Sequence, residues 1–108
     1  MKLIFLRHAQ GTHNSDAVRR GSIAYFDPIH TDAPLDDVGL CQTVANQREF
    51  DCDFIYCSPM KRCRDTLMQV MPASKDRPVR LDDRIMETQG GAACNRRSAK
   101  LTLSLIHI

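Results

Sequence analysis

The chain has 108 residues, of which 43% are apolar and 26% charged, and this composition is that of one small soluble globular domain. A net charge of +2 excludes the strong overall attraction to nucleic acids or membranes that a very basic protein has, and it leaves room for a local basic pocket. The apolar run at the N-terminus is too short for a membrane span or a signal peptide, and an odd count of five cysteines indicates free thiols. We therefore expect a cytoplasmic protein.

The first predicted elements are a buried strand, a long loop and a helix. Residues 2–6 predict a strand, because their apolar run from Leu3 to Leu6 is typical of a strand covered on both faces in a parallel α/β sheet. Residues 10–33 are polar, contain Gly and Pro and show no sustained period, so they predict mainly a loop. A helix is expected to begin near Asp36, which can cap it, and to continue to about Glu49. The apolar stripe of this helix consists of Val38, Cys41 and Ala45.

The following segments alternate clearly between strand and helix patterns. Residues 53–57 predict a second buried strand. Ser58 is a good N-cap for the next helix, Pro59 fits its first turn, and Pro72 is expected to end it. The apolar stripe of this helix consists of Met60, Cys63, Leu67, Val70 and Met71. Residues 78–81 predict a short third strand.

The order of these elements places two groups of polar residues at one place. Strand, loop, helix, strand, helix and strand in succession favour an α/β sheet with right-handed crossovers. In such sheets, ligands bind beyond the carboxyl ends of the strands. Arg7 and His8 directly follow the first predicted strand, and residues 58–62 directly follow the second. We therefore expect both groups to lie at the same edge of the sheet.

The residue types at this edge suit phosphoryl transfer. Such a reaction needs a nucleophile in line with the leaving oxygen and positive donors for the equatorial oxygens. The neutral imidazole of His8 can attack phosphorus and form a phosphohistidine. Arg62 falls in the first turn of a predicted helix, and its planar guanidinium can bind phosphate oxygens bidentately beside a helix N-terminus that favours anions.

Four segments of the chain also follow one another in the order and at the spacing of the motifs of a known family. They are Leu6-Arg7-His8-Ala9, Leu35 to Gln42, Cys57 to Thr66, and Arg84-Ile85-Met86-Glu87. These segments resemble the Arg-His-Gly motif, the Leu-Thr-x-x-Gly-x-x-Gln helix start, the Ser-Ser-Pro-x-x-Arg-x-x-x-Thr segment and the Glu-bearing stretch of the histidine phosphatase superfamily, the phosphoglycerate mutase-like proteins. The resemblance extends from residue 2 to about residue 91.

This resemblance implies an α/β fold, specifically the three-layer αβα phosphoglycerate mutase-like fold, and a role for each matched residue. His8 would be the nucleophile that accepts the phosphoryl group, and Glu87 would donate a proton to the leaving group. Arg7 and Arg62 would bind the phosphoryl oxygens together with Asn14, which stands seven residues after Arg7 as the phosphate-pocket Asn of the family does. The family resemblance implies no metal and no other cofactor. Its implied partner is a phosphorylated small molecule or phosphoprotein, with neither nucleic acid nor membrane.

Two departures from the family pattern modify this expectation. Ala9 stands where the family usually has Gly, which is a small change. The family's second essential His, usually followed by Gly or Ser, has no counterpart, since His107 follows Glu87 too closely to leave room for the intervening elements. We therefore expect an incomplete fold, with residues 1–91 as a partial histidine phosphatase domain and residues 92–108 as a non-matching tail of a truncated or frame-altered product.

The expected activity of the parent domain is hydrolysis of a phosphomonoester through a phosphohistidine, weak or absent in this chain. One alternative is a phosphotransferase of the phosphoglycerate mutase type, and another is a non-catalytic module that binds phosphorylated ligands. His13 and His30 are expected to be loop residues, and Arg64 a charge on a helix surface. The first four cysteines stand eleven, five and six residues apart, which disfavours a zinc site.

A cysteine-dependent phosphatase is the remaining enzyme alternative, and the spacing disfavours it. Such enzymes place five residues between a nucleophilic Cys and an Arg in one loop. Four residues separate Cys57 from Arg62, and six separate it from Arg64. We therefore expect Cys57 to be a buried thiol at the end of a strand.

Overall fold

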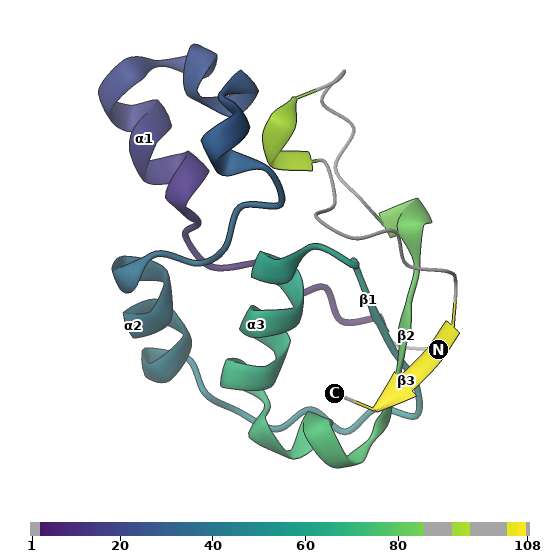
Figure 1. The fold of residues 1–108 in the computed structure, drawn as a ribbon. Coiled ribbons are helices and arrows are strands. Elements are labelled where there is room, and N and C mark those ends of the chain that lie inside the picture. Colours follow the sequence, from purple (N-terminus) through teal and green to yellow (C-terminus); the bar gives the residue numbers. More distant parts are fainter. Residues whose placement is uncertain (1–2, 86–91, 96–103, 108) are drawn as a thin grey trace.

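The computed structural model describes residues 3–85, 92–95 and 104–107 (Figure 1). The α-helices are α1 (Thr12–Arg20), α2 (Asp37–Ala45) and α3 (Lys61–Val70); the 3₁₀ helices are η1 (Ser22–Phe26), η2 (Pro28–His30), η3 (Pro72–Asp76), η4 (Asp83–Ile85) and η5 (Ala93–Asn95); and the strands are β1 (Ile55–Cys57), β2 (Pro78–Leu81) and β3 (Ser104–His107). The chain therefore has mixed helix and strand, in agreement with the α/β class. No helix within these ranges is long and apolar enough to cross a membrane.

The sheet is built on a parallel pair of strands. β1 pairs in parallel with β2, with Cys57 opposite Leu81, and α3 connects the two strands. β2 occupies the predicted residues and β1 lies inside the predicted range 53–57, so both strand predictions are confirmed. β3 pairs antiparallel with β2, and this register places His107 opposite Pro78, at the end of β2 far from Leu81.

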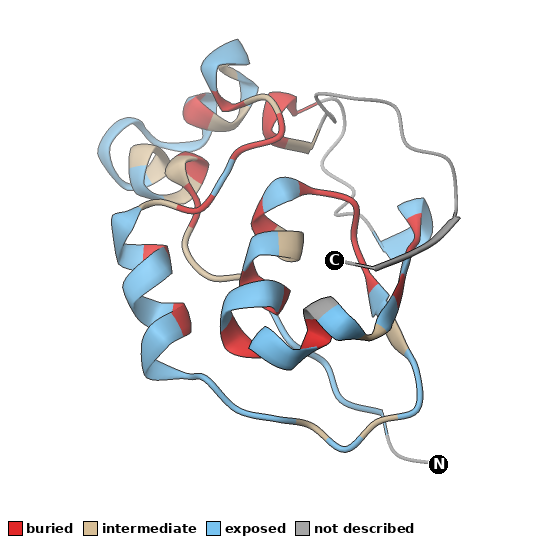
Figure 2. Cartoon of the chain, turned by 60° about the horizontal axis from the view of Figure 1, so that its bottom comes forward, coloured by how far each residue is buried: buried red, intermediate tan, exposed pale blue. Residues whose placement is uncertain are grey.

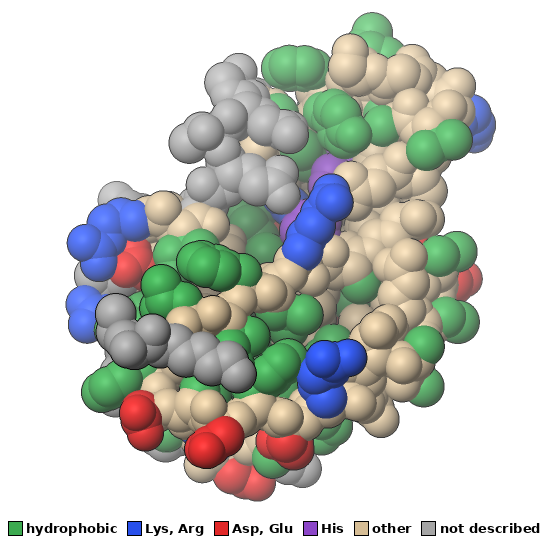
Figure 3. Space-filling model, turned by 180° about the vertical axis from the view of Figure 1, so that it is seen from behind, with side chains coloured by type: hydrophobic (Ala, Val, Ile, Leu, Met, Phe, Trp, Pro, Cys, Tyr) green, Lys and Arg blue, Asp and Glu red, His purple; other side chains and the backbone are tan. Residues whose placement is uncertain are grey.

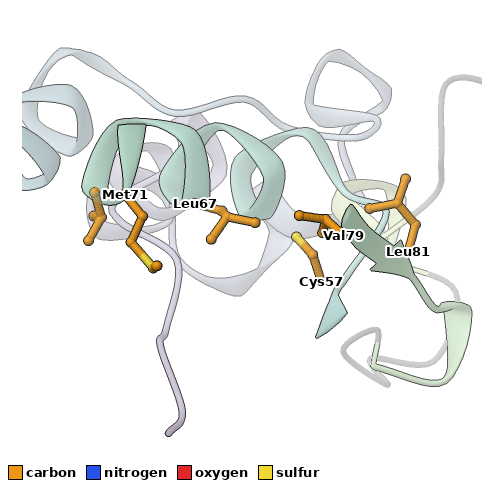
Figure 4. Packing of buried hydrophobic residues seen from close by; sticks show 6 residues of the cluster. Cys57, Leu67, Met71, Val79 and Leu81 are labelled. Carbon is orange, nitrogen blue, oxygen red and sulfur yellow. The ribbon is translucent and has the colours of Figure 1, made fainter. Parts of the chain in front are cut away.

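The core of the sheet lies under one face of α3 (Figure 4). Its buried residues are Cys57, Leu67, Val70, Met71, Val79 and Leu81. The predicted apolar stripe of α3 is confirmed, because its members pack against this cluster or are otherwise buried, with Cys63 half-buried at its border. The helix ends at Val70, in agreement with the expected effect of Pro72.

The prediction of a buried first strand is wrong for the described residues of the N-terminal run. Leu3, Ile4, Phe5 and Leu6 are all exposed, Phe5 by 90%, and form no strand (Figure 2). An apolar run favours burial but supplies no partner strand. Among the described strands the order is β1-β2-β3, and none of them pairs with this segment. The segment therefore keeps its apolar side chains in solvent.

The prediction of a loop over residues 10–33 is wrong where α1, η1 and η2 form. Helix α1 has no continuous apolar stripe, so its sequence lacks the usual signal of a helix. It is stabilised instead by a short-range ion pair of Asp16 with Arg19 (2.7 Å) and by a second ion pair of Asp16 with Arg20. The side-chain oxygen of Asn14 also accepts a hydrogen bond from Gly11 N–H (2.9 Å) at the start of α1.

Helix α2 begins as predicted but presents a different face to the protein. The carboxylate of Asp36 accepts a hydrogen bond from Gly39 N–H (2.7 Å), which confirms the expected N-cap. The predicted apolar stripe is exposed, and the buried residues are Gly39 and Thr43. The reason is close backbone contact, because a Cβ at Gly39 would lie 2.1 Å from the carbonyl oxygen of Gln10. The helix ends at Ala45, earlier than expected.

Candidate functional site

The half-buried imidazole of His8 has a hydrogen bond that fixes where its lone pair lies. Its Nδ1 is 2.6 Å from the carbonyl oxygen of Ala9. A carbonyl oxygen can only accept, so Nδ1 carries the proton and donates. In the neutral ring the lone pair then belongs to Nε2. The ring of His8 therefore has the tautomer that a nucleophile attacking through Nε2 requires.

Thr66 connects the His8 segment to helix α3. Its buried hydroxyl accepts a hydrogen bond from Ala9 N–H (3.0 Å) and donates one to the carbonyl of Arg62 (2.6 Å). The side chain of Thr66 thus bridges the backbone of Ala9, which follows His8, and the backbone of Arg62. The predicted proximity of the two segments is therefore present, although the strand that was expected to position His8 is not formed.

The first turn of α3, which carries Arg62, is held by a distant residue. Lys61 N–H donates a hydrogen bond to the carboxylate of Asp32 (2.9 Å), and Asp32 is buried. The predicted N-cap, Ser58, lies too early, because Met60 is the N-cap residue and the Ser58 hydroxyl only accepts a long hydrogen bond from Met60 N–H (3.4 Å). A carboxylate from the 21–35 region therefore replaces the local cap.

The guanidinium of Arg62 is buried and binds two oxygens of η5. Its Nη1 donates to the carbonyl of Cys94 and its Nη2 donates to the side-chain oxygen of Asn95, both at 2.7 Å. Arg62 is only 1% exposed. Two acceptors side by side at this distance match the geometry with which a guanidinium binds a carboxylate or phosphate. In this structure protein oxygens occupy the fork of the Arg62 guanidinium.

Two aromatic contacts join the His8 side of the site to the η5 side. The ring centroids of His8 and His13 are 5.9 Å apart, and those of His13 and Tyr25 are also 5.9 Å apart. Tyr25 packs against a buried cluster that includes Ala33 and Cys94. On the face in Figure 3, His side chains lie beside a basic side chain in a hollow near the middle. The imidazole and the guanidinium therefore belong to one connected region.

The remaining predicted site residues are Arg7, Asn14 and Glu87. Arg7 is exposed, and Asn14 is half-buried in the first turn of α1 with its amide oxygen bonded to Gly11 N–H. Glu87 lies outside the described residues. The roles predicted for these three residues, and for His8 and Arg62, stay predictions.

Two histidines expected in loops are buried in helices instead. His13 lies in α1 between two aromatic rings. His30 lies in η2, with Nε2 2.7 Å from the carboxylate of Asp16 and Nδ1 3.3 Å from the hydroxyl of Thr12. Hydrogen bonds from Arg20, His30 and Arg19 hold the pKa of the Asp16 carboxyl far below its usual range. This cluster lines a cavity of about 600 Å³ that includes neither His8 nor Arg62.

Residue patterns missed three positioning residues. Thr66 belongs to the segment 57–66 that resembles a family motif, and this resemblance could have indicated its role. Nothing in the sequence around Asp32 indicates that it caps α3. Asp82 directly follows β2, its N–H donates to the carbonyl of Cys57 (3.0 Å), and it is buried. Hydrogen bonds from the side chain and backbone of Arg84 lower the pKa of Asp82 to about 2. Asp82 therefore fixes the turn at the carboxyl edge of the sheet.

Cys57 and the other residues that could act as nucleophiles or ligands differ in how far they are buried. Cys57 is buried at the end of β1, as expected, and burial raises the pKa of its thiol to about 12. A thiol that is protonated at neutral pH is a poor nucleophile. Among the described residues, no group of three His, Cys, Asp or Glu side chains could hold a metal ion. Arg64, expected on the helix surface, is half-buried.

Comparisons with known proteins agree on the family to which this arrangement points. The sequence pattern of the histidine phosphatase superfamily (branch 1) matches residues 3–103. A protein of Schizosaccharomyces pombe named as a probable phosphatase is 32% identical over 90 residues, which are 81% of this chain and 39% of that relative. The chain thus spans about two fifths of the length of the relative. No solved structure gives a significant match.

Proposed function

The chain belongs to the histidine phosphatase superfamily, and on this premise we propose that it hydrolyses phosphomonoesters through a phosphohistidine on His8. The observation that carries the proposal is the hydrogen bond from His8 Nδ1–H to the Ala9 carbonyl, since it leaves the lone pair on Nε2. An imidazole in this tautomer can attack phosphorus without first losing a proton. The whole reaction, its substrate and its partners are part of the proposal.

In the proposed reaction, His8 Nε2 forms a bond to phosphorus while the bond to the leaving oxygen breaks. The leaving oxygen takes the bonding electron pair and receives a proton from Glu87. Water then attacks the phosphohistidine, Glu87 accepts a proton from it, and inorganic phosphate leaves while Nε2 regains its lone pair. Arg7, Asn14 and Arg62 stabilise the equatorial oxygens in both steps, since charge develops there.

The proposal extends to the fold and surroundings of the domain. A three-layer αβα arrangement is supported by the parallel β1–α3–β2 unit and by α3 packed on one face of the sheet. The substrate is proposed to be a phosphorylated small molecule or phosphoprotein, without nucleic acid or membrane. All five cysteines are free, which suits a reducing compartment such as the cytoplasm.

One observation favours a second candidate function, a non-catalytic module that binds phosphorylated ligands. The family's second essential His has no counterpart in the sequence, whereas Arg7, Asn14 and Arg62, which are proposed to bind the phosphoryl oxygens, are present. Such a module would bind phosphate without chemistry at His8.

One assay separates the two functions. The purified chain and His8→Ala are incubated with an aryl phosphate, and Arg48→Ala, which changes an exposed arginine, serves as a control for surface charge. The phosphatase proposal expects turnover by the wild type and by Arg48→Ala, and background only for His8→Ala. Equal background turnover by wild type and His8→Ala would contradict phosphatase activity and support the binding module.

A further inference from the structure

The side chain of Arg62 and the turn η5 form a closed pair that the proposed reaction does not use. The carbonyl of Cys94 and the side-chain oxygen of Asn95 each accept a hydrogen bond of 2.7 Å from a different terminal nitrogen of Arg62. Both acceptors therefore take up directions in which two oxygens of one phosphate would be bound. The turn is in this respect an internal substitute for the anion.

The turn is anchored beside the site rather than on a remote surface. Ala92, Ala93 and Cys94 are at most 2% exposed, and they pack near Ala33 and Tyr25. The short yellow-green helix in Figure 1 is η5, which lies beside the η1 and η2 region. Because Tyr25 also contacts the His13 ring, the turn is packed against the region that carries the His8 imidazole.

The closed pair also contains a weakness that favours its opening. Asn95 offers a neutral carboxamide oxygen, which binds a guanidinium less strongly than a charged oxygen does. The Nδ2 atom of Asn95 is buried and has no hydrogen-bond partner among the described residues. A buried donor without an acceptor is energetically costly. Exposure of the Asn95 side chain to solvent removes this cost, because water then accepts a hydrogen bond from Nδ2.

We propose that η5 is an autoinhibitory turn, in which Cys94 and Asn95 occupy the Arg62 guanidinium and must be displaced before a phosphate group can bind there. This inference rests on the proposed function, because it takes Arg62 as a phosphate-binding residue. The apparent affinity for phosphate then equals the intrinsic affinity multiplied by the fraction of molecules with the turn displaced. Changes that weaken the contact of Asn95 with Arg62 raise that fraction.

Two substitutions at one position change this equilibrium in opposite directions. Asn95→Ala removes the contact with Nη2, and the resulting gain in affinity for inorganic phosphate is about tenfold, as expected for one charge-assisted hydrogen bond. Asn95→Asp places a carboxylate against the guanidinium and lowers phosphate affinity by about tenfold or more. Asn46→Ala, at the exposed end of α2, is the matched control and leaves the affinity unchanged.

The experiment titrates each folded variant with inorganic phosphate by calorimetry, and follows amide hydrogen exchange of the wild type. In the closed turn, Asn95 N–H donates to the carbonyl of Ala92 (3.1 Å), so saturating phosphate is expected to speed exchange at Asn95. Weaker binding by Asn95→Ala would overturn the proposal and make the carboxamide a phosphate ligand. Equal affinity of the Ala and Asp variants, or unchanged exchange at Asn95, would overturn it as well.

The same titration distinguishes failure of this inference from failure of the proposed function. If Arg62→Ala binds phosphate as tightly as the wild type does, Arg62 is not a phosphate ligand, and both the autoinhibitory turn and the role of Arg62 in the proposed reaction are wrong. If Arg62→Ala weakens binding while Asn95→Ala does not strengthen it, only the autoinhibitory turn is wrong. Hydrogen exchange in the wild type keeps the test decisive even if Asn95→Ala does not fold.

Discussion

The hydroxyl of Thr66 connects the backbone next to His8 to helix α3. Its removal tests whether this connection positions His8 in addition to stabilising the fold. Thr66→Val keeps the shape of the side chain and deletes the hydroxyl that bridges Ala9 N–H and the Arg62 carbonyl at 3.0 Å and 2.6 Å. Each lost hydrogen bond contributes about 1 kcal/mol, and the half-buried Ala9 N–H loses its acceptor, so the free energy of unfolding is expected to fall by about 1–3 kcal/mol.

The matched variant Thr66→Ser keeps the hydroxyl and loses one buried methyl group. Its expected cost in unfolding free energy is about 1 kcal/mol, close to the lower bound for the valine variant. The activities should differ much more, because only Thr66→Val releases the backbone next to His8. A misplacement of a reacting group by about 1 Å costs roughly 100-fold in turnover, whereas Thr66→Ser should stay within about threefold of the wild type.

Urea unfolding measures the stabilities of these two variants, and hydrolysis of an aryl phosphate measures their turnover. Equal turnover by the two variants would refute the role of the hydroxyl in positioning His8, whether both variants keep their activity or both lose it.

Three further predictions concern the packing, the pH dependence and the thiol chemistry of the fold. Gly39→Ala should destabilise the chain, because a Cβ 2.1 Å from the backbone carbonyl of Gln10 costs about 3 kcal/mol or more, which exceeds the roughly 1 kcal/mol that Ala gains in a helix. Asp82, whose pKa Arg84 lowers from 3.8 to about 2, should stabilise the fold above pH 4, and a pH series of melting temperatures should show this contribution disappearing as the pH falls through 2. Cys57, whose pKa burial raises to about 12, should resist alkylation at pH 8 in the folded chain and react in urea, as mass spectrometry can measure.

Each of these three predictions has a matched control in the chain and a result that would contradict it. Leu40→Ala, at an exposed position of α2, should change stability by less than about 0.5 kcal/mol, and a Gly39→Ala variant more stable than wild type would show that helix propensity dominates. Asp82→Asn should reduce the acid-dependent part of the melting curve, to which Asp16 also contributes; an unchanged curve would exclude Asp82 as a source. Exposed Cys41 should react in the folded chain, and equal alkylation of Cys57 would contradict its burial.

Local patterns predicted the parts of the fold in which neighbouring residues decide the structure. β2 has the expected bounds, and α3 shows the expected stripe because its apolar face packs on the strands that flank it in sequence. The run from Leu3 to Leu6 shows the limit of this approach, since an apolar composition does not specify a partner strand. Helix α1 was missed because charged pairs around Asp16 stabilise it instead of an apolar stripe.

The candidate site divides in the same way. Residue type and spacing led to the prediction of His8 and Arg62 as site residues, and the segments that carry them meet through Thr66. The contacts that control them are long-range: Asp32 caps a helix 29 residues later, and Asn95 binds Arg62 from 33 residues away. Sequence spacing carries no information about such pairs, so the capped helix and the occupied guanidinium emerge only from the tertiary arrangement.

Detection of a phosphoryl group on the His8 ring tests the phosphohistidine proposal directly. The chain is mixed with an aryl phosphate, quenched in base, where phosphohistidine persists, and analysed by peptide mass spectrometry, with an acid-quenched sample as control. We expect a phosphorylated peptide that contains His8, absent after acid treatment and strongly reduced in Arg62→Ala. Turnover of the aryl phosphate without any such peptide would contradict a phosphohistidine on His8. Undiminished turnover by His8→Ala would contradict it as well.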